Sequence, residues 1–313
     1  MEATLKHTQS LKRFHILAWI TALSTLALIT LGGFVHNTGS SLACPDWPLC
    51  FGQVMPKMEG GVAIEHSHRL LASFVGLLSI GLVYLAHPIR AQHPKLYKVS
   101  IYALLAVIVQ GILGGITVIY KLPPMVSTSH LGLSQIYFAI TLWMVLRSRG
   151  NSLSGPAPSS KILKFLATVT GLLFLQMLIG AAMRHTGAGA ACGLGPEYSV
   201  LCLDAATGGT TWWPEQAQSQ FHVIHRYLGI LMVFFIVGAT IPLIKWAKAN
   251  GHKVIRILCV AAHVVVLLQV ILGIMSVMSH LGPSAVTLHL TFAAALFALL
   301  ISLNILSREA KNS

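Results

Sequence analysis

Glu65-His66-Ser67-His68-Arg69 returns 157 residues later as His222-Val223-Ile224-His225-Arg226. In both copies a histidine is followed directly by an arginine, and an ionisable residue stands three positions before that histidine. A duplicated chain places such residues at equivalent points of two similar half-structures. The repeat therefore predicts a protein built from two halves with one architecture.

Two further sets of segments repeat, and each pair of sets keeps one constant offset. In the first pairing, Gln110–Gly114 with His130 corresponds to Gln269–Gly273 with His289, at an offset of 159 residues. In the second, Thr38-Gly39 with Cys44 corresponds to Thr186-Gly187 with Cys192, at an offset of 148 residues. Each half thus carries two histidines at matched places.

The composition indicates a membrane protein with many spans. Apolar residues make up 55% of the 313 residues and charged residues only 9%, against roughly 25% charged residues in soluble domains. Eight apolar runs reach the length of about 20 residues that a spanning helix needs. They lie near residues 15–35, 66–86, 98–119, 128–146, 162–183, 222–243, 255–276 and 286–306. These runs are too long for barrel strands, so they predict an all-α fold.

The net charge of +13 reflects topology rather than a nucleic-acid partner, which we do not expect. All but five of the 21 basic residues fall in segments on one side of the predicted spans, and six of the eight acidic residues fall on the other side. By the positive-inside rule both termini face the cytoplasm, or a mitochondrial matrix. The two long cysteine-bearing loops, 36–65 and 184–221, then lie on the outer side of a cell (inner) membrane.

The repeat and a flexible segment together predict the domain organisation. Residues 1–148 form an N-terminal four-helix half, residues 149–161 a Gly/Ser/Pro-rich cytoplasmic linker, and residues 162–313 a C-terminal four-helix half. Because four helices return the chain to the same side, the halves are expected to be parallel repeats, each a four-helix bundle.

The four matched histidines, His68, His130, His225 and His289, are expected near the outer ends of their helices. In a four-helix bundle, two facing imidazoles can hold a heme iron between them. A single membrane histidine is more often a packing or interface residue. Ionisable residues at four repeat-equivalent places, however, indicate function, and we favour one bis-histidine heme site in each half. Zinc is disfavoured because neither half supplies further ligands at compact spacing.

Charged neighbours of these histidines suggest two further roles. Arg69 and Arg226 can bind heme propionates through paired hydrogen bonds, or they can be interface arginines with no ligand. Glu65 lies three residues before His68 on one helical face, where the second half has His222. It is a candidate catalytic acid or base; the alternative is a structural pair with Arg69.

Four of the five cysteines lie in the outer loops, where disulfides can form. We expect the pairs Cys44–Cys50 and Cys192–Cys202, with either a structural or a redox role. His66 and Trp47 are interpreted as residues of the interface or of a pocket wall.

The run Cys44-Pro45-Asp46-Trp47-Pro48-Leu49-Cys50, followed by Glu65-x-x-His68-Arg69, resembles heme A synthase, a family of the cytochrome oxidase assembly pathway. The resemblance covers essentially the whole chain. It implies oxidation of the C8 methyl of heme O to a formyl group, giving heme A. It also implies heme O as substrate at His68 and His130, with Glu65 alongside, and a heme b cofactor at His225 and His289.

The resemblance also implies partners. These are heme O synthase as heme donor, the cytochrome oxidase assembly machinery, an unknown electron partner and membrane lipid. A homo-oligomer with a second copy of the chain is a further option. Two other functions remain open: a diheme electron-transfer cytochrome, and a transporter built from parallel repeats. Neither explains why Glu65 replaces a histidine in one half only.

Overall fold

The computed structural model describes residues 2–149, 153 and 155–309. Within this part of the chain, eight helices are long and apolar enough to cross a membrane. They are α1 (Glu2–Asn37), α2 (Gly60–Ala86), α3 (Pro94–Ile119), α4 (Pro124–Ser148), α5 (Ser160–His185), α6 (Ala217–Ala249), α7 (Lys253–Met278) and α8 (Pro283–Ser307). The prediction of an α-helical membrane protein with eight spans is confirmed.

Most helices begin earlier than their apolar runs because local start signals lie outside those runs. Helices α3, α4 and α8 begin at prolines, a residue suited to the first turn because it has no N–H to leave unpaired. Helix α5 begins inside the predicted linker, where the Ser159 side chain accepts a hydrogen bond from the Ile162 N–H. Of that linker, residues 150–152 and 154 lie outside the described residues.

The chain divides into two compact units, one of residues 1–122 and 129–152 and the other of residues 123–128 and 153–313. In the second unit α5 packs on α6 and α8, and α7 packs on α6 and α8, so the four helices close on each other. In the first unit α2 packs on α1 and α3. The relation of the two halves as parallel repeats stays a prediction.

Helix α4 is hydrogen-bonded to all three other helices of the first unit. The bonds are His15–Ser148 to α1 (2.9 Å), Ser79–Tyr137 to α2 (2.6 Å) and Gln110 to the His130 carbonyl from α3 (2.9 Å). Polar side chains therefore fix α4 in an otherwise apolar unit.

The turn between α3 and α4 has the same backbone form as the turn between α7 and α8. Lys121 and Leu122 have φ of 56° and 62°, and His280 and Leu281, each 159 positions further on, have φ of 56° and 59°. Two successive non-glycine residues with positive φ are uncommon. In each half, this turn leads into the helix that carries the second histidine of the predicted pair, which is His130 on α4 and His289 on α8.

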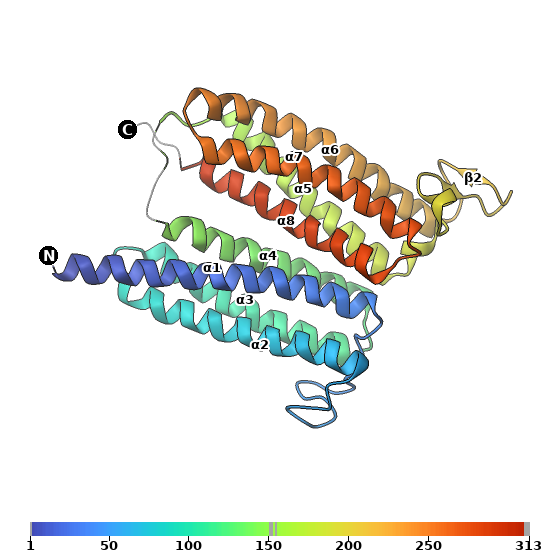
Figure 1. Cartoon of the computed structure of the whole chain (residues 1–313), viewed down its shortest axis with the longest axis horizontal. Coiled ribbons are helices and arrows are strands. Elements are labelled where there is room, and N and C mark those ends of the chain that lie inside the picture. Colours follow the sequence, from blue (N-terminus) through green and yellow to red (C-terminus); the bar gives the residue numbers. More distant parts are fainter. Residues whose placement is uncertain (1, 150–152, 154, 310–313) are drawn as a thin grey trace. The chain divides into compact units, whose positions relative to one another are not determined.

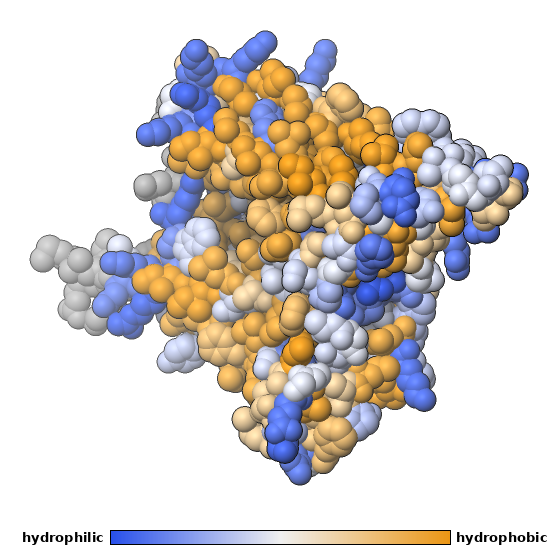
Figure 2. Space-filling model, turned by 45° about the vertical axis from the view of Figure 1, so that its right-hand side comes forward, coloured by the Kyte–Doolittle hydropathy of each residue, from blue (hydrophilic) through white to orange (hydrophobic). Residues whose placement is uncertain are grey.

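Loops 38–59 and 186–216 join α1 to α2 and α5 to α6, each at one end of its own unit (Figure 1). Both expected disulfides, Cys44–Cys50 and Cys192–Cys202, are present. The second loop also contains 3₁₀ turns η2 (Ala188–Ala190) and η3 (Pro196–Tyr198) and an antiparallel pair of short strands, β1 (Cys202–Leu203) and β2 (Thr210–Thr211); a third such turn, η1 (His87–Ile89), follows α2. Apolar residues cover much of the helical surface, with hydrophilic ones gathered toward helix ends and loops (Figure 2).

Candidate functional site

The two histidines of the second unit face each other. His225 on α6 and His289 on α8 have ring centroids 6.5 Å apart, with an interplanar angle of 81°. An ion held between two imidazoles, with metal–nitrogen bonds of about 2 Å, separates the ring centres by roughly 6 Å. The pair therefore fits axial ligation of one heme iron. In the first unit, His130 on α4 lies within electrostatic range of His68 on α2.

Every one of the four histidine rings rests against a glycine of the preceding helix. A Cβ at these glycines would lie 3.0 Å from His68 (Gly32), 3.3 Å from His130 (Gly114), 2.7 Å from His225 (Gly180) and 3.4 Å from His289 (Gly273). The missing side chains let the rings approach the neighbouring backbone. The sequence analysis did not assign these glycines to the site, although they obey the same offsets of 148 and 159 residues.

Glutamines hold the backbone of three of the four histidines. Gln110 donates a hydrogen bond to the carbonyl of His130, and Gln269 donates one to that of His289, both at 2.9 Å. Gln176 does the same for His225 at 2.7 Å. The repeated Gln-Gly segments thus position the histidine of the following helix through a hydrogen bond and a close contact.

Two ring nitrogens of this set are buried without a hydrogen bond. They are Nδ1 of His130 and Nδ1 of His289, each at the same point of its half. A buried polar atom without a partner is unfavourable, so these rings are suited to a bound group that would compensate. The paired imidazoles of the second unit, each beside a glycine, are a donor set that fits heme.

Glu65 is almost fully buried, with 4% exposed, and both its carboxylate oxygens are bonded. Oε1 accepts a charge-assisted bond from Arg69 at 2.6 Å, and Oε2 accepts the backbone N–H of Cys44 at 2.8 Å. The pairing with Arg69, one of the two predicted alternatives, is therefore present. At the matched place in the second unit, His222 is equally buried and its Nδ1 makes no hydrogen bond.

The two arginines grip the disulfide-bonded loops. Arg69 donates to the carbonyls of Cys44, Asp46 and Leu49. Arg226 donates through Nη1 to the carbonyls of the residues that precede Cys202, which are Tyr198, Val200 and Leu201. This clamp was not predicted from the sequence. Their predicted bonds to heme propionates stay a prediction, for which the buried, unbonded Nη2 of Arg226 is suitably placed.

The first loop is closed on itself by Asp46. Its carboxylate accepts the N–H groups of Phe51 and Gly52 at 2.6 and 2.8 Å. These bonds, the one from Gly52 foremost, hold the pKa of Asp46 below its usual value. The next residue, Trp47, lies so close to α3 that a Cβ on Gly115 would meet its ring at 2.7 Å. The loop thus touches α3 directly beside Gly114, the platform of His130.

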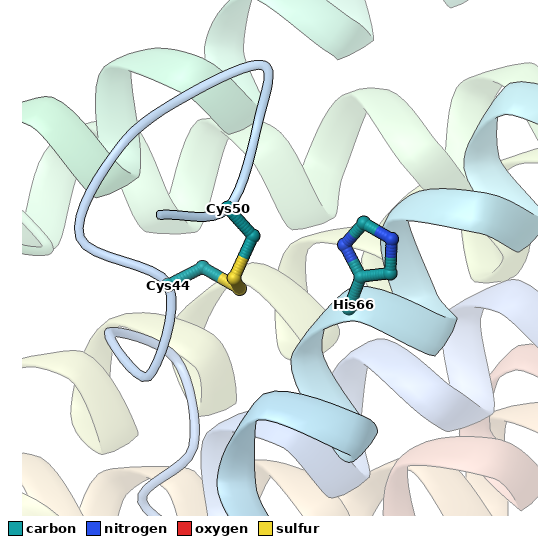
Figure 3. Close-up of side chains that lie close together, drawn as sticks. All are labelled: Cys44, Cys50 and His66. Atoms are coloured by element: carbon teal, nitrogen blue, oxygen red, sulfur yellow. A yellow bond between two sulfur atoms is a disulfide. The ribbon is translucent and has the colours of Figure 1, made fainter. Parts of the chain in front are cut away.

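His66, which was predicted at the interface or in a pocket wall, is 4% exposed. Its ring stands beside the Cys44–Cys50 disulfide (Figure 3).

The fold and these sites define a class: a multi-pass α-helical membrane protein with two histidine pairs suited to heme. Residues 15–63 and 57–301 match the family model described as cytochrome oxidase assembly protein, and the chain belongs to this family. It is also 28% identical over 301 residues to the proteins named heme A synthase of Bacillus cereus (strain 03BB102), Bacillus anthracis (strain A0248) and Bacillus thuringiensis subsp. konkukian. The matches cover 94% of this chain and 93% of each relative.

Proposed function

We propose that this protein is a heme A synthase, a membrane oxidoreductase that converts the C8 methyl of heme O to the formyl group of heme A. Its family and its similarity to proteins of that name support the assignment. The observation that carries it is the opposed pair His225 and His289, 6.5 Å apart, with a matched pair in the other half.

The two pairs have different tasks in this proposal. His225 and His289 hold a heme b cofactor, and the unbonded Nη2 of Arg226 is free to bind a propionate. His68 and His130 orient the substrate, heme O. Bound heme supplies the redox chemistry that oxidation of an unactivated methyl requires, and the protein supplies ligands and a dry environment.

Glu65 is the candidate proton carrier because it occurs only in the half assigned to the substrate. Its carboxylate is held in one orientation by Arg69 and by the Cys44 N–H. Oxidation of a methyl group requires proton transfers, and a fixed carboxylate can accept or return a proton. The other half has His222 in place of this carboxylate, which agrees with a cofactor site that needs no such group.

The remaining assignments concern the cell. We propose that both termini are cytoplasmic and that the disulfide loops are on the outer side of the membrane, as the charge distribution indicates. Heme O synthase is the proposed donor of a lipid-soluble substrate that arrives through the bilayer. The product is delivered to the cytochrome oxidase assembly machinery, and an unidentified partner exchanges electrons with the protein.

The first test is mass analysis of hemes extracted from cells that make heme O, with and without this chain. We expect heme A only when the chain is present, and its loss in the Glu65→Gln variant. A folded, heme-loaded protein in cells that contain only heme B and heme O would overturn the proposal and favour the diheme electron-transfer cytochrome.

A further inference from the structure

A second group of potential metal ligands lies outside the four-histidine set. It consists of the Sγ atoms of Cys44 and Cys50 and one ring nitrogen of His66, which all lie within 4.8 Å of one another. The two cysteines are fully buried, and both come from the first loop, whereas the His66 ring reaches them from α2 (Figure 3).

The imidazole of His66 has no other task in the structure. Neither Nδ1 nor Nε2 makes a hydrogen bond, although both are buried. Such a ring is costly unless something binds it. It is not needed to form a disulfide of this kind, because the second loop forms one without it: there Val223, at the position equivalent to His66, packs with Cys192 and Cys202 in an apolar cluster.

We propose that Cys44, Cys50 and His66 form a three-coordinate site for the thiophilic ion Cu(I) when the Cys44–Cys50 disulfide is reduced. Thiolates and imidazole are the soft ligands that select Cu(I). Zinc prefers four ligands, and among the described residues this group contains three.

The disulfide and the metal compete for the same sulfurs. A dithiol reductant transfers two electrons to the Cys44–Cys50 bond; that bond breaks, and the reductant becomes a disulfide. Its two protons go to the cysteine sulfurs, and Cu(I) displaces them to solvent without changing its own oxidation state. The site therefore exists in the reduced protein and is absent from the oxidised one.

The test uses full-length, heme-loaded protein in detergent, reduced with a phosphine, desalted without oxygen and titrated with Cu(I) against bicinchoninate. We expect the reduced protein to hold one Cu(I) and the unreduced protein none. His66→Val introduces the residue found at the equivalent position of the second unit, Val223. We expect it to weaken Cu(I) binding at least about tenfold, because loss of even an indirect partner of a metal ligand typically costs that much.

Two controls keep the result specific. Cys192→Ser with Cys202→Ser should leave the retained copper unchanged, and the heme absorption spectrum should show that every variant is folded. X-ray absorption should show two sulfurs and one nitrogen around copper. Equal retention by His66→Val, loss of copper in the second-loop variant, or a site with sulfur ligands only would overturn the proposal. Because copper is measured without heme O, none of these outcomes depends on the synthase activity.

Discussion

The rings of His225 and His289 are 6.5 Å apart and nearly perpendicular in plane. That spacing is close to the roughly 6 Å expected for two imidazoles that ligate one metal ion. Gly180 and Gly273 contribute to this distance, because their lack of a side chain allows each ring to lie against a neighbouring helix.

Removing either ring should therefore empty the second site. His225→Ala and His289→Ala are each expected to lose nearly all tightly bound heme b, since the iron loses an axial ligand. Heme content per protein, measured by absorption, checks this. His263→Ala is the matched control, because His263 lies in the same unit and bonds Thr240 instead. Full heme retention in the first two variants would refute the ligand assignment.

A single methyl group should disturb the same site from the glycine side. In Gly180→Ala the added carbon would lie 2.7 Å from Cε1 of His225, and relief of such overpacking costs about 1–3 kcal/mol. We expect lower heme b content and a lower thermal midpoint. Gly171→Ala, in the same helix but with no atom within 4 Å of its Cβ, should match the wild type. Equal losses in both variants would rule out contact with the His225 ring as the cause, since alanine favours a helix more than glycine does.

Glu65→Gln should separate chemistry from heme binding. Glutamine keeps the shape and can still accept the Cys44 N–H, but it can no longer carry a proton. Because a positioned acid or base contributes roughly 10²–10⁴-fold, heme A formation should fall by about 10²-fold or more while bound heme stays constant. The ratio of heme A to heme O in extracts measures the effect. Unchanged turnover would reduce Glu65 to its structural bond with Arg69.

Asp46→Asn should loosen the first loop. The lowered pKa of Asp46 means that its charged form stabilises the folded loop. This contribution is present above the ordinary pKa of 3.8 and is lost as the pH falls through the lower folded value. At neutral pH the variant should show faster amide hydrogen exchange at Phe51 and Gly52. Asp204→Asn, in the other loop, should leave those amides unchanged.

The sequence was sufficient to predict the eight membrane-spanning helices, because a long apolar run can satisfy its backbone hydrogen bonds in a bilayer only as a helix. It also predicted both disulfides, since Cys44–Cys50 and Cys192–Cys202 are each close in sequence. Helix ends were less predictable: α6 begins at Ala217, several residues before its apolar run, because polar side chains can continue a helix into the loop region.

The details around the histidines needed coordinates. No periodicity shows that Arg69 donates to loop carbonyls, because an arginine that binds a propionate would stand at the same place in the sequence. The burial of His66 depends on how the first loop folds over α2. The glycine platforms had a usable signal, their constant offsets, but glycine in a membrane helix is also common for helix packing.

The four glycine platforms have a consequence for how this sequence can drift. A Cβ added at Gly32, Gly114 or Gly180 would lie within 3.3 Å of a histidine ring, so a substitution there requires the ring to shift. The polar partners face no such barrier: the two halves already differ at Glu65 and His222 and at His66 and Val223. The two halves thus share the glycines beside the histidine rings and differ in the side chains at these two neighbouring positions.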